Sequence, residues 1–524
     1  MTETVEIGQN AGSRKQDSWR TFNTIFLVAM ATVIVPPYFR LLGPGFWTLI
    51  GLNEAEWSVV SAVRALVFVI FVLAAGVIGD FWGRRRTLLL TLVPFIAASF
   101  FMVILPPGPV FMVVSGAASI LGTMIRALTV TLVILAFEPR DRIIPITIYS
   151  LTSGVVSALS PVLARAIGQS LSYQLFFLIP VVMGGFGFWQ ILKYVPKSRA
   201  WGHFKRQNVV AMSIWAFGLC VVLFAAIEGR GLGWTHPLVL ASFAIGALIL
   251  VALMVLERLP LSGAWNFTLY YKGRMAVAIY AGIVINIALY AILLNIFNFL
   301  SRIQSYSDII AGLALFPILV GAVGLTALFA RYTTNWTYGR ALTASLIVLA
   351  LPAAGLSVMH LEISYWILVP FLMLVGFGFI LGAAPRFLLL STSVPVDLSA
   401  TVQAIGAATG QIGMGVANSF MLTLIYRFGG EVFVGRMSDQ AGVSNEQAMQ
   451  VLTRLVEGDG NILASLPAGV RDAVAQSFEH TIKQAYVLGL SRAMLALAAL
   501  CLVSAGVVYL ALRQPWIQKV QHEE

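Results

Sequence analysis

Fourteen apolar runs, each long enough to cross a membrane as a helix, dominate this chain of 524 residues. A helix needs about 20 apolar residues to span the hydrocarbon core of a bilayer. The composition agrees, because 59% of the residues are hydrophobic and only 10% are charged, too few charges to cover a soluble domain of this length. The sequence therefore predicts an all-α membrane protein with 14 transmembrane helices in the lipid bilayer. The predicted spans are 21–42, 56–79, 87–105, 109–136, 143–168, 173–194, 207–229, 236–257, 275–300, 307–330, 338–359, 364–385, 399–426 and 485–512.

The distribution of basic residues predicts the orientation. An even number of spans places both termini on one side. The short loops on the opposite side then hold only Arg40, Arg230 and Arg302, whereas most other basic residues, Arg386 among them, fall in the tails and the remaining short loops. Cytoplasmic loops are enriched in Lys and Arg. We therefore expect a multi-pass protein of the cell (inner) membrane with both termini cytoplasmic, and an uncleaved first span rather than a signal peptide.

Several other classes of protein are not indicated. The net charge is +11, but the basic residues lie in short loops between apolar runs, which argues against nucleic acid as a partner. Cys220 and Cys501 lie inside apolar runs and form neither a disulfide framework nor a metal cluster. Gly229, Gly231 and Gly233 lie in a short turn between spans, so they do not form a phosphate loop. We expect no enzyme activity, no cofactor and no bound metal.

One inner loop carries a distinctive pattern, Gly76-Val-Ile-Gly79-Asp80-Phe81-Trp82-Gly83-Arg84-Arg85-Arg86, between the second and third spans. Glycines allow close approach of helices and loop. Arginines alone could be a topology signal, but that would not explain a single carboxylate among three glycines. The carboxylate is placed to meet either an arginine or a helix N-terminus. We therefore predict that this hairpin is a gating element, formed by Gly76, Gly79, Asp80, Gly83 and Arg84.

Charged residues within spans are costly and are functional candidates by default. Arg126 lies about ten residues before the end of its span, roughly 15 Å from the inner surface. Arg64 and Arg165 lie in the outer halves of their spans, where their side chains could equally reach the outer interface. A guanidinium facing a cavity would attract a carboxylate or a phosphate. These three arginines are candidates for coupling to protons or substrate, and no acidic residue lies at mid-span.

Polar amides in spans are weaker candidates for lining a cavity. Asn286, Asn295, Gln403 and Gln411 could contact substrate, or could form hydrogen bonds between helices. The hydrophilic segment 427–484 is predicted to form two short amphipathic helices on the outer surface, with a capping box at Ser444-Asn-Glu-Gln447.

The hairpin pattern G-x-x-x-D-x-x-G-R-R resembles the loop between helices 2 and 3 of the major facilitator superfamily. Other stretches are similar to its fourteen-helix drug:proton antiporter branch: Glu56-Trp57 at the start of helix 2, Arg126 in helix 4, Ser160-Pro161 of the antiporter motif in helix 5, and Glu228 to Trp234 after helix 7. The resemblance implies the major facilitator fold, two six-helix pseudo-repeat halves with two extra central helices. It implies a tail at 1–20, an N-terminal half at 21–194, inserted helices at 195–257, a C-terminal half at 258–512 and a tail at 513–524.

The resemblance also implies roles for residues. Asp80 would meet the N-terminus of a helix of the C-terminal half, near residues 397–399, and hold one conformation closed. The chain departs from the branch at three places: the first span has no acid, Phe81 replaces an arginine, and Arg165 stands at a glycine position. The first and third departures bear on proton coupling, and the second on the gating loop.

These observations predict a secondary active transporter that exports amphiphilic or lipophilic small molecules by alternating access, with coupling to protons implied by the resemblance. The arginines favour an anionic or zwitterionic substrate. The alternatives are a facilitator or a lipid or anion transporter without proton coupling, and a membrane scaffold that has kept the fold without transporting.

Overall fold

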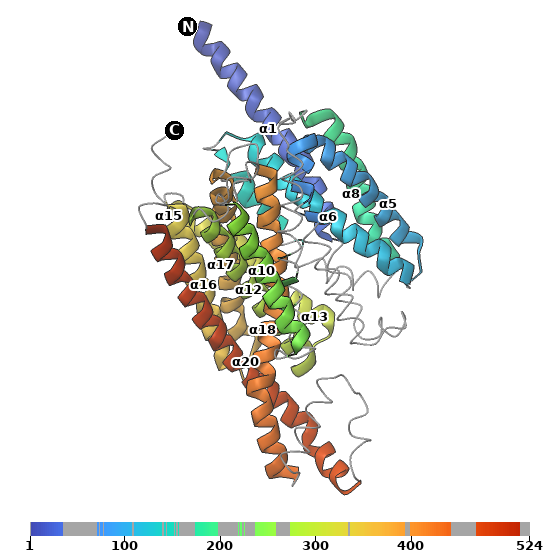
Figure 1. Cartoon of the computed structure of the whole chain (residues 1–524), viewed down its shortest axis with the longest axis vertical. Helices are drawn as coiled ribbons and strands as arrows, with labels where there is room; N and C mark the ends of the chain where they lie inside the picture. Colours follow the sequence, from blue (N-terminus) through green and yellow to red (C-terminus); the bar gives the residue numbers. More distant parts are fainter. Residues whose placement is uncertain are drawn as a thin grey trace.

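The computed structural model is all-helical throughout the residues that it describes (Figure 1). The described residues are 2–34, 71–72, 74–76, 78–106, 109–138, 141–142, 144–150, 152–153, 156, 173–196, 218, 221–222, 225, 236–257, 273–333, 336–393, 399–441 and 468–513. Within these ranges, eight helical segments are long and apolar enough to cross a membrane. Each falls on a predicted span, whereas the total of fourteen stays a prediction. The eight segments are Arg84–Ile104, Val113–Ala136, Leu175–Tyr194, Gly273–Ile303, Ile310–Phe329, Tyr338–Val358, Tyr365–Thr392 and His480–Arg513.

Four helices of the first 200 residues form one packed group. Helices α1 and α5 each pack against both α6 and α8. Large aromatic side chains fill the space between them, with Phe95, Phe176 and Phe177 fully buried. Between membrane helices such side chains stabilise the group by close van der Waals packing, since lipid is as apolar as they are. The bounds are α1 (Thr2–Ile34), α5 (Arg84–Ile104), α6 (Pro109–Ala136) and α8 (Tyr173–Tyr194).

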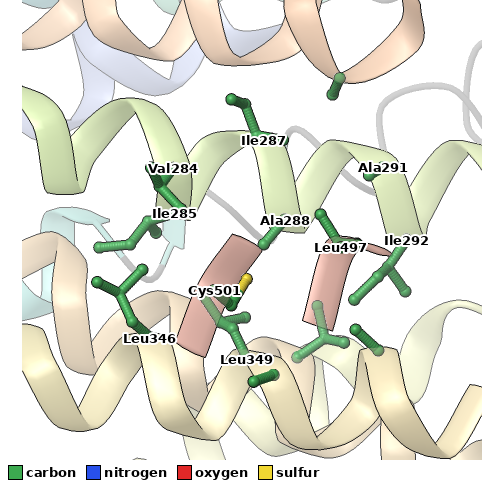
Figure 2. Packing of buried hydrophobic residues seen from close by; sticks show 14 of the residues in the cluster. Val284, Ile285, Ile287, Ala288, Ala291, Ile292, Leu346, Leu349, Leu497 and Cys501 are labelled. Atoms are coloured by element: carbon green, nitrogen blue, oxygen red, sulfur yellow. The ribbon is translucent and has the colours of Figure 1, made fainter. Parts of the chain in front are cut away.

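The helices after residue 272 form a second packed group, organised around α12 (Gly273–Asn298). Figure 2 shows Ile285, Ala288 and Ile292 of α12 facing buried side chains of α16 (Tyr338–Gly355) and α20 (Ala468–Arg513). Helices α17 (Tyr365–Thr392) and α18 (Ser399–Ala441) complete this group. Helix α10 (Pro237–Glu257) precedes it in the chain.

The predicted tenth span is interrupted rather than a single α-helix. It consists of α13 (Asp308–Leu313), α14 (Phe316–Val320), the π-helical turn η3 (Gly321–Leu325) and α15 (Thr326–Thr333). Ser307 caps α13 by accepting a hydrogen bond from the backbone of Ile310, and Pro317 lies in the first turn of α14. Proline is favoured in a first helical turn, where its missing N–H has no partner to lose. Two shorter segments follow other helices, namely η2 (Phe299–Ile303) after α12 and η4 (Leu356–Val358) after α16.

The two groups meet through α6 and α18. Ala127 of α6 is buried in the core of the second group, and Ala384 and Leu388 of α17 are buried in the core of the first. Tyr338, at the start of α16, packs against both cores. It lies close enough to act on the charge of Arg142, whose pKa is lowered by burial. The helical groups are therefore in contact at the end of the molecule where α16 begins.

Four helices extend beyond the predicted spans. Helix α1 begins at Thr2, so the predicted tail at 1–20 is largely helical. Helix α17 continues to Thr392, so Arg386 lies inside a helix with 6% of its surface exposed, not in an inner loop. Helices α18 and α20 extend well past their predicted limits, to Ala441 and back to Ala468.

The described parts of the segment 427–484 are continuations of α18 and α20. The second predicted surface helix is the first part of α20, whereas the first, after Ser444, lies outside the described residues. At 43 residues, α18 is about 65 Å long, twice what a bilayer core requires. The two helices project together from the end of the molecule opposite Thr2 (Figure 1). Gly429 and Gly489 permit the close approach, since a Cβ on Gly429 would lie 2.6 Å from the carbonyl oxygen of Ala485. This pairing lets both helices continue as one structure, and the predicted capping box lies outside the described residues.

Candidate functional site

The gating hairpin is built around a backbone break at Gly83. Residues 78–82 are helical, and α5 begins at Arg84. Between them Gly83 has φ 93° and ψ 128°, a conformation that a side chain disfavours. The hydroxyl of Thr87 donates to the carbonyl oxygens of Gly83 and Ile78, at 3.2 and 3.3 Å, and ties the two helix ends together. Gly76, Gly79 and Gly83 are all buried, in agreement with a tightly packed turn.

Asp80 is paired with Arg84 across this break. The guanidinium donates from Nη2 and Nε to Oδ1 of Asp80, at 2.9 and 3.2 Å. The two side chains are only 10% and 5% exposed. The neighbouring Arg85 donates to the backbone oxygen of Leu192 at 2.9 Å, which joins the hairpin to the end of α8. The sequence allowed two partners for the Asp80 carboxylate, an arginine or a helix N-terminus, and the structure shows the arginine. Contact with the helix near residues 397–399 stays a prediction, because 394–398 lie outside the described residues.

We expect Gly83→Ala to destabilise the protein, by about 1–3 kcal/mol, because alanine would be forced into a sparsely populated backbone region. The measurement is the thermal unfolding of the purified protein. Gly116→Ala is the matched control, since a Cβ there would meet nothing within 4 Å and glycine is the weaker helix former. Equal melting temperatures for the two variants would contradict the strained conformation of Gly83.

Arg126 is the accessible residue in an otherwise buried stretch. Of the eight membrane-length segments described, the one in α6 has the largest buried share. From Gly122 to Ile134 every residue of α6 is buried except Arg126, which is partly exposed. Its Nη1 donates to the backbone oxygen of Thr32 at 3.2 Å, and its Nη2 donates to the hydroxyl of Thr123. A Cβ at Gly122 would lie 3.3 Å from Thr32, so glycine there lets α1 come within reach of the guanidinium.

Two tyrosines, Tyr149 and Tyr290, lie close enough to act on the charge of Arg126. Tyr149, in the helix that follows α6, is 2.9 Å from the hydroxyl of Thr129. Since Thr129 uses its one proton on the carbonyl oxygen of Arg126, Tyr149 must be the donor in this pair. Tyr290 comes from α12, in the second helical group. Sequence reasoning missed both, because a tyrosine in an apolar run carries no charge to mark it.

Three of the amide candidates form hydrogen bonds within one helix or between two helices. Asn286 and Asn295 are 6% and 4% exposed, and each donates at 2.7 Å to a carbonyl oxygen four residues earlier, in Gly282 and Ala291. Gln403 is fully buried and donates to Ser391 and to the backbone of Phe387. Helix packing accounts for these contacts, and a role in lining a cavity stays a prediction. Gln411 lies on α18, but its side chain is not described, and Arg64, Ser160, Pro161 and Arg165 lie outside the described residues.

Arg386 is buried like Arg84, and it was missed as a site candidate because it was placed in a loop. Its guanidinium carbon lies 4.5 Å from the ring centroid of Phe387. In the part of the chain that the structure describes, no group of three or more His, Cys, Asp or Glu could hold a metal ion.

The chain is similar in sequence and in fold to known membrane transporters. The profile of the Major Facilitator Superfamily matches residues 21–418. The chain is 25% identical to the methylenomycin A resistance protein of Bacillus subtilis (strain 168), over 60% of this chain and 67% of that protein. It is 23% identical to the multidrug resistance protein Stp of Mycobacterium tuberculosis (strain CDC 1551 / Oshkosh), over 70% and 67%. The crystal structure of the human organic anion transporter MFSD10 (TETRAN) superimposes with a TM-score of 0.58 at 12% identity, covering 94% and 99% of the two chains.

Proposed function

The chain belongs to the Major Facilitator Superfamily, and we propose that it is a secondary active exporter of amphiphilic or lipophilic small molecules. It is a multi-pass membrane protein and a transporter rather than an enzyme. Export is supported by relatives named as methylenomycin A and multidrug resistance proteins. Those alignments span about two thirds of each relative, so the substrate and direction are proposed for this chain.

The observation that carries the proposal is the division into two helical groups, each with its own apolar core. Alternating access requires two bodies that can rock against each other about a site between them. Arg126 faces that boundary, with Tyr149 on its own side and Tyr290 on the other. The hairpin at Gly83 lies at one end of the first group, where the Asp80–Arg84 pair can act on its movement.

The proposal also covers the branch of the family, the arrangement of the helices, the charge of the substrate and the coupling ion. We assign the chain to the fourteen-helix drug:proton antiporter branch, with six-helix halves at 21–194 and 258–512, inserted helices at 195–257 and both termini cytoplasmic. The substrate is anionic or zwitterionic. Protons are the coupling ion implied by this branch, although the first span offers no acid to carry them. There are two alternatives to a proton-coupled exporter: a facilitator without proton coupling, and a scaffold that does not transport.

The test uses the purified protein in proteoliposomes with an imposed pH gradient and a pH-sensitive dye inside. A panel of lipophilic anions, zwitterions and cations is added, and both substrate flux and proton movement are recorded. Proton movement evoked by one charge class is the expected result. Flux without proton movement would support the facilitator, and the absence of flux for every compound would leave the scaffold.

A further inference from the structure

We infer that the exporter holds its substrate through a carboxylate or sulfonate group bound between Arg126 of one helical group and Tyr290 of the other. This inference rests on the proposed function and deepens it, because it commits to a lipophilic organic anion. It also assigns Tyr290 of α12 as a contact in the second group.

Arg126 is partly exposed although it lies well inside a membrane-length helix. A charged side chain facing hydrocarbon would be costly. The remainder of the stretch Gly122–Ile134 is buried by protein, so the exposed part of Arg126 opens inside the molecule rather than to lipid. A guanidinium kept accessible in such a place is available to a bound molecule.

The Arg126 guanidinium has more hydrogen-bond donors than its contacts with the described residues use. Arginine carries five N–H donors. In the described part of the chain, two of them are used, one on Thr32 and one on Thr123. No carboxylate of the described residues forms an ion pair with Arg126. A planar anion can accept two parallel hydrogen bonds from the donors that remain.

The two tyrosines near Arg126 come from different helical groups. Tyr149 donates its proton to Thr129, whose hydroxyl donates to the backbone oxygen of Arg126, so its proton is already used within the first group. Tyr290 is partly exposed and comes from α12 across the boundary. A substrate that touches both Arg126 and Tyr290 would contact both helical groups. Movement of the groups would then change its binding, as alternating access requires.

The experiment compares compounds that differ in charge but hardly in shape: ω-phenylalkanoates of increasing chain length, their primary amides and the corresponding amines. Binding to the purified protein in nanodiscs is measured by calorimetry. We expect the anion to bind at least about tenfold more tightly than the amide, as for a hydrogen bond to a charged group. Arg126→Gln should abolish this preference, so that the anion binds no more tightly than the amide. Tyr290→Phe should reduce anion affinity about threefold or more.

Two further variants keep the test decisive. Tyr280→Phe is the matched control, because Tyr280 lies on the same helix and its hydroxyl bonds Ser504 at 2.8 Å. If Arg126→Gln does not fold, Arg126→Lys retains the charge but loses the planar fork, and it should weaken the preference. The inference is overturned if the parent protein shows no preference for the anion at any chain length, or if the preference survives Arg126→Gln.

Flux of the same compounds through proteoliposomes separates this inference from the proposed function. Transport without a preference for the anion would overturn the anion site and leave the transporter. Charge-selective binding without transport of any compound would leave the site and overturn the exporter.

Discussion

Replacing Gly376 by alanine is expected to prevent α17 from packing against the interrupted tenth span. A Cβ on Gly376 would overlap the backbone oxygen of Ile318 and lie 2.8 Å from the backbone nitrogen of Ala322. Gly321 makes the reciprocal contact, since its Cβ would overlap the backbone of Met373. Backbone atoms cannot rotate away as a side chain can, so the helices must separate. Overpacking costs typically about 1–3 kcal/mol, and we expect Gly376→Ala at or above the upper end.

The measurement is the melting temperature and the monodisperse yield of the purified protein. Gly321→Ala should cause a similar loss, and the double variant should cost less than the sum because both act on one contact. Gly324→Ala is the control, since it lies in the same π-helical turn and a Cβ there would meet nothing within 4 Å. A normal melting temperature for Gly376→Ala would show that the two segments are not this close in the protein.

This contact marks a limit of prediction from sequence. The apolar run 307–330 predicts that a span exists, and the structure has helix there. The run does not reveal that the span is broken, because the glycines acquire their meaning only from the backbone of α17, some 50 residues away. Small residues are favoured wherever membrane helices approach closely, so their presence alone does not identify a partner.

The full lengths of α18 and α20 were not predictable for a related reason. Hydropathy finds where a helix leaves the apolar layer, not where it ends. Both helices continue because they pack on each other at Gly429 and Gly489, a tertiary contact that local composition does not contain. By contrast, the predicted bounds of α6 and α8 agree with the structure, since each ends where its apolar run ends.

The candidate site was predictable where a charge marked it. Arg126 is identified by the cost of a guanidinium in a span, and Asp80 by its place among glycines. Tyr290 and Tyr149 were not identifiable, because their proximity to Arg126 depends on how three helices pack. Arg386 was misplaced because a charge near the end of an apolar run was taken to end the helix.

Asp80→Asn is expected to destabilise the protein strongly, because it removes the negative charge beside a nearly buried guanidinium. The pair is 2.9 Å apart and its side chains are 10% and 5% exposed. Removal of one member of a buried ion pair typically costs about 3–5 kcal/mol, since the other charge loses its compensation. Arg84→Gln should cost a similar amount. In the double variant Asp80→Asn with Arg84→Gln neither charge remains, so its loss should be well below the sum of the two.

Thermal unfolding of the parent, the two single variants and the double variant gives the coupling between the two residues. Arg86→Gln is the control, because Arg86 is exposed and lies two residues after Arg84. Additive losses would contradict the pair. Flux through proteoliposomes then separates two roles of Asp80. If it serves only to neutralise Arg84, the double variant should recover stability and transport together. If it also latches the helix near residues 397–399, the double variant should recover stability but not transport, because asparagine lacks the charge that a helix N-terminus attracts.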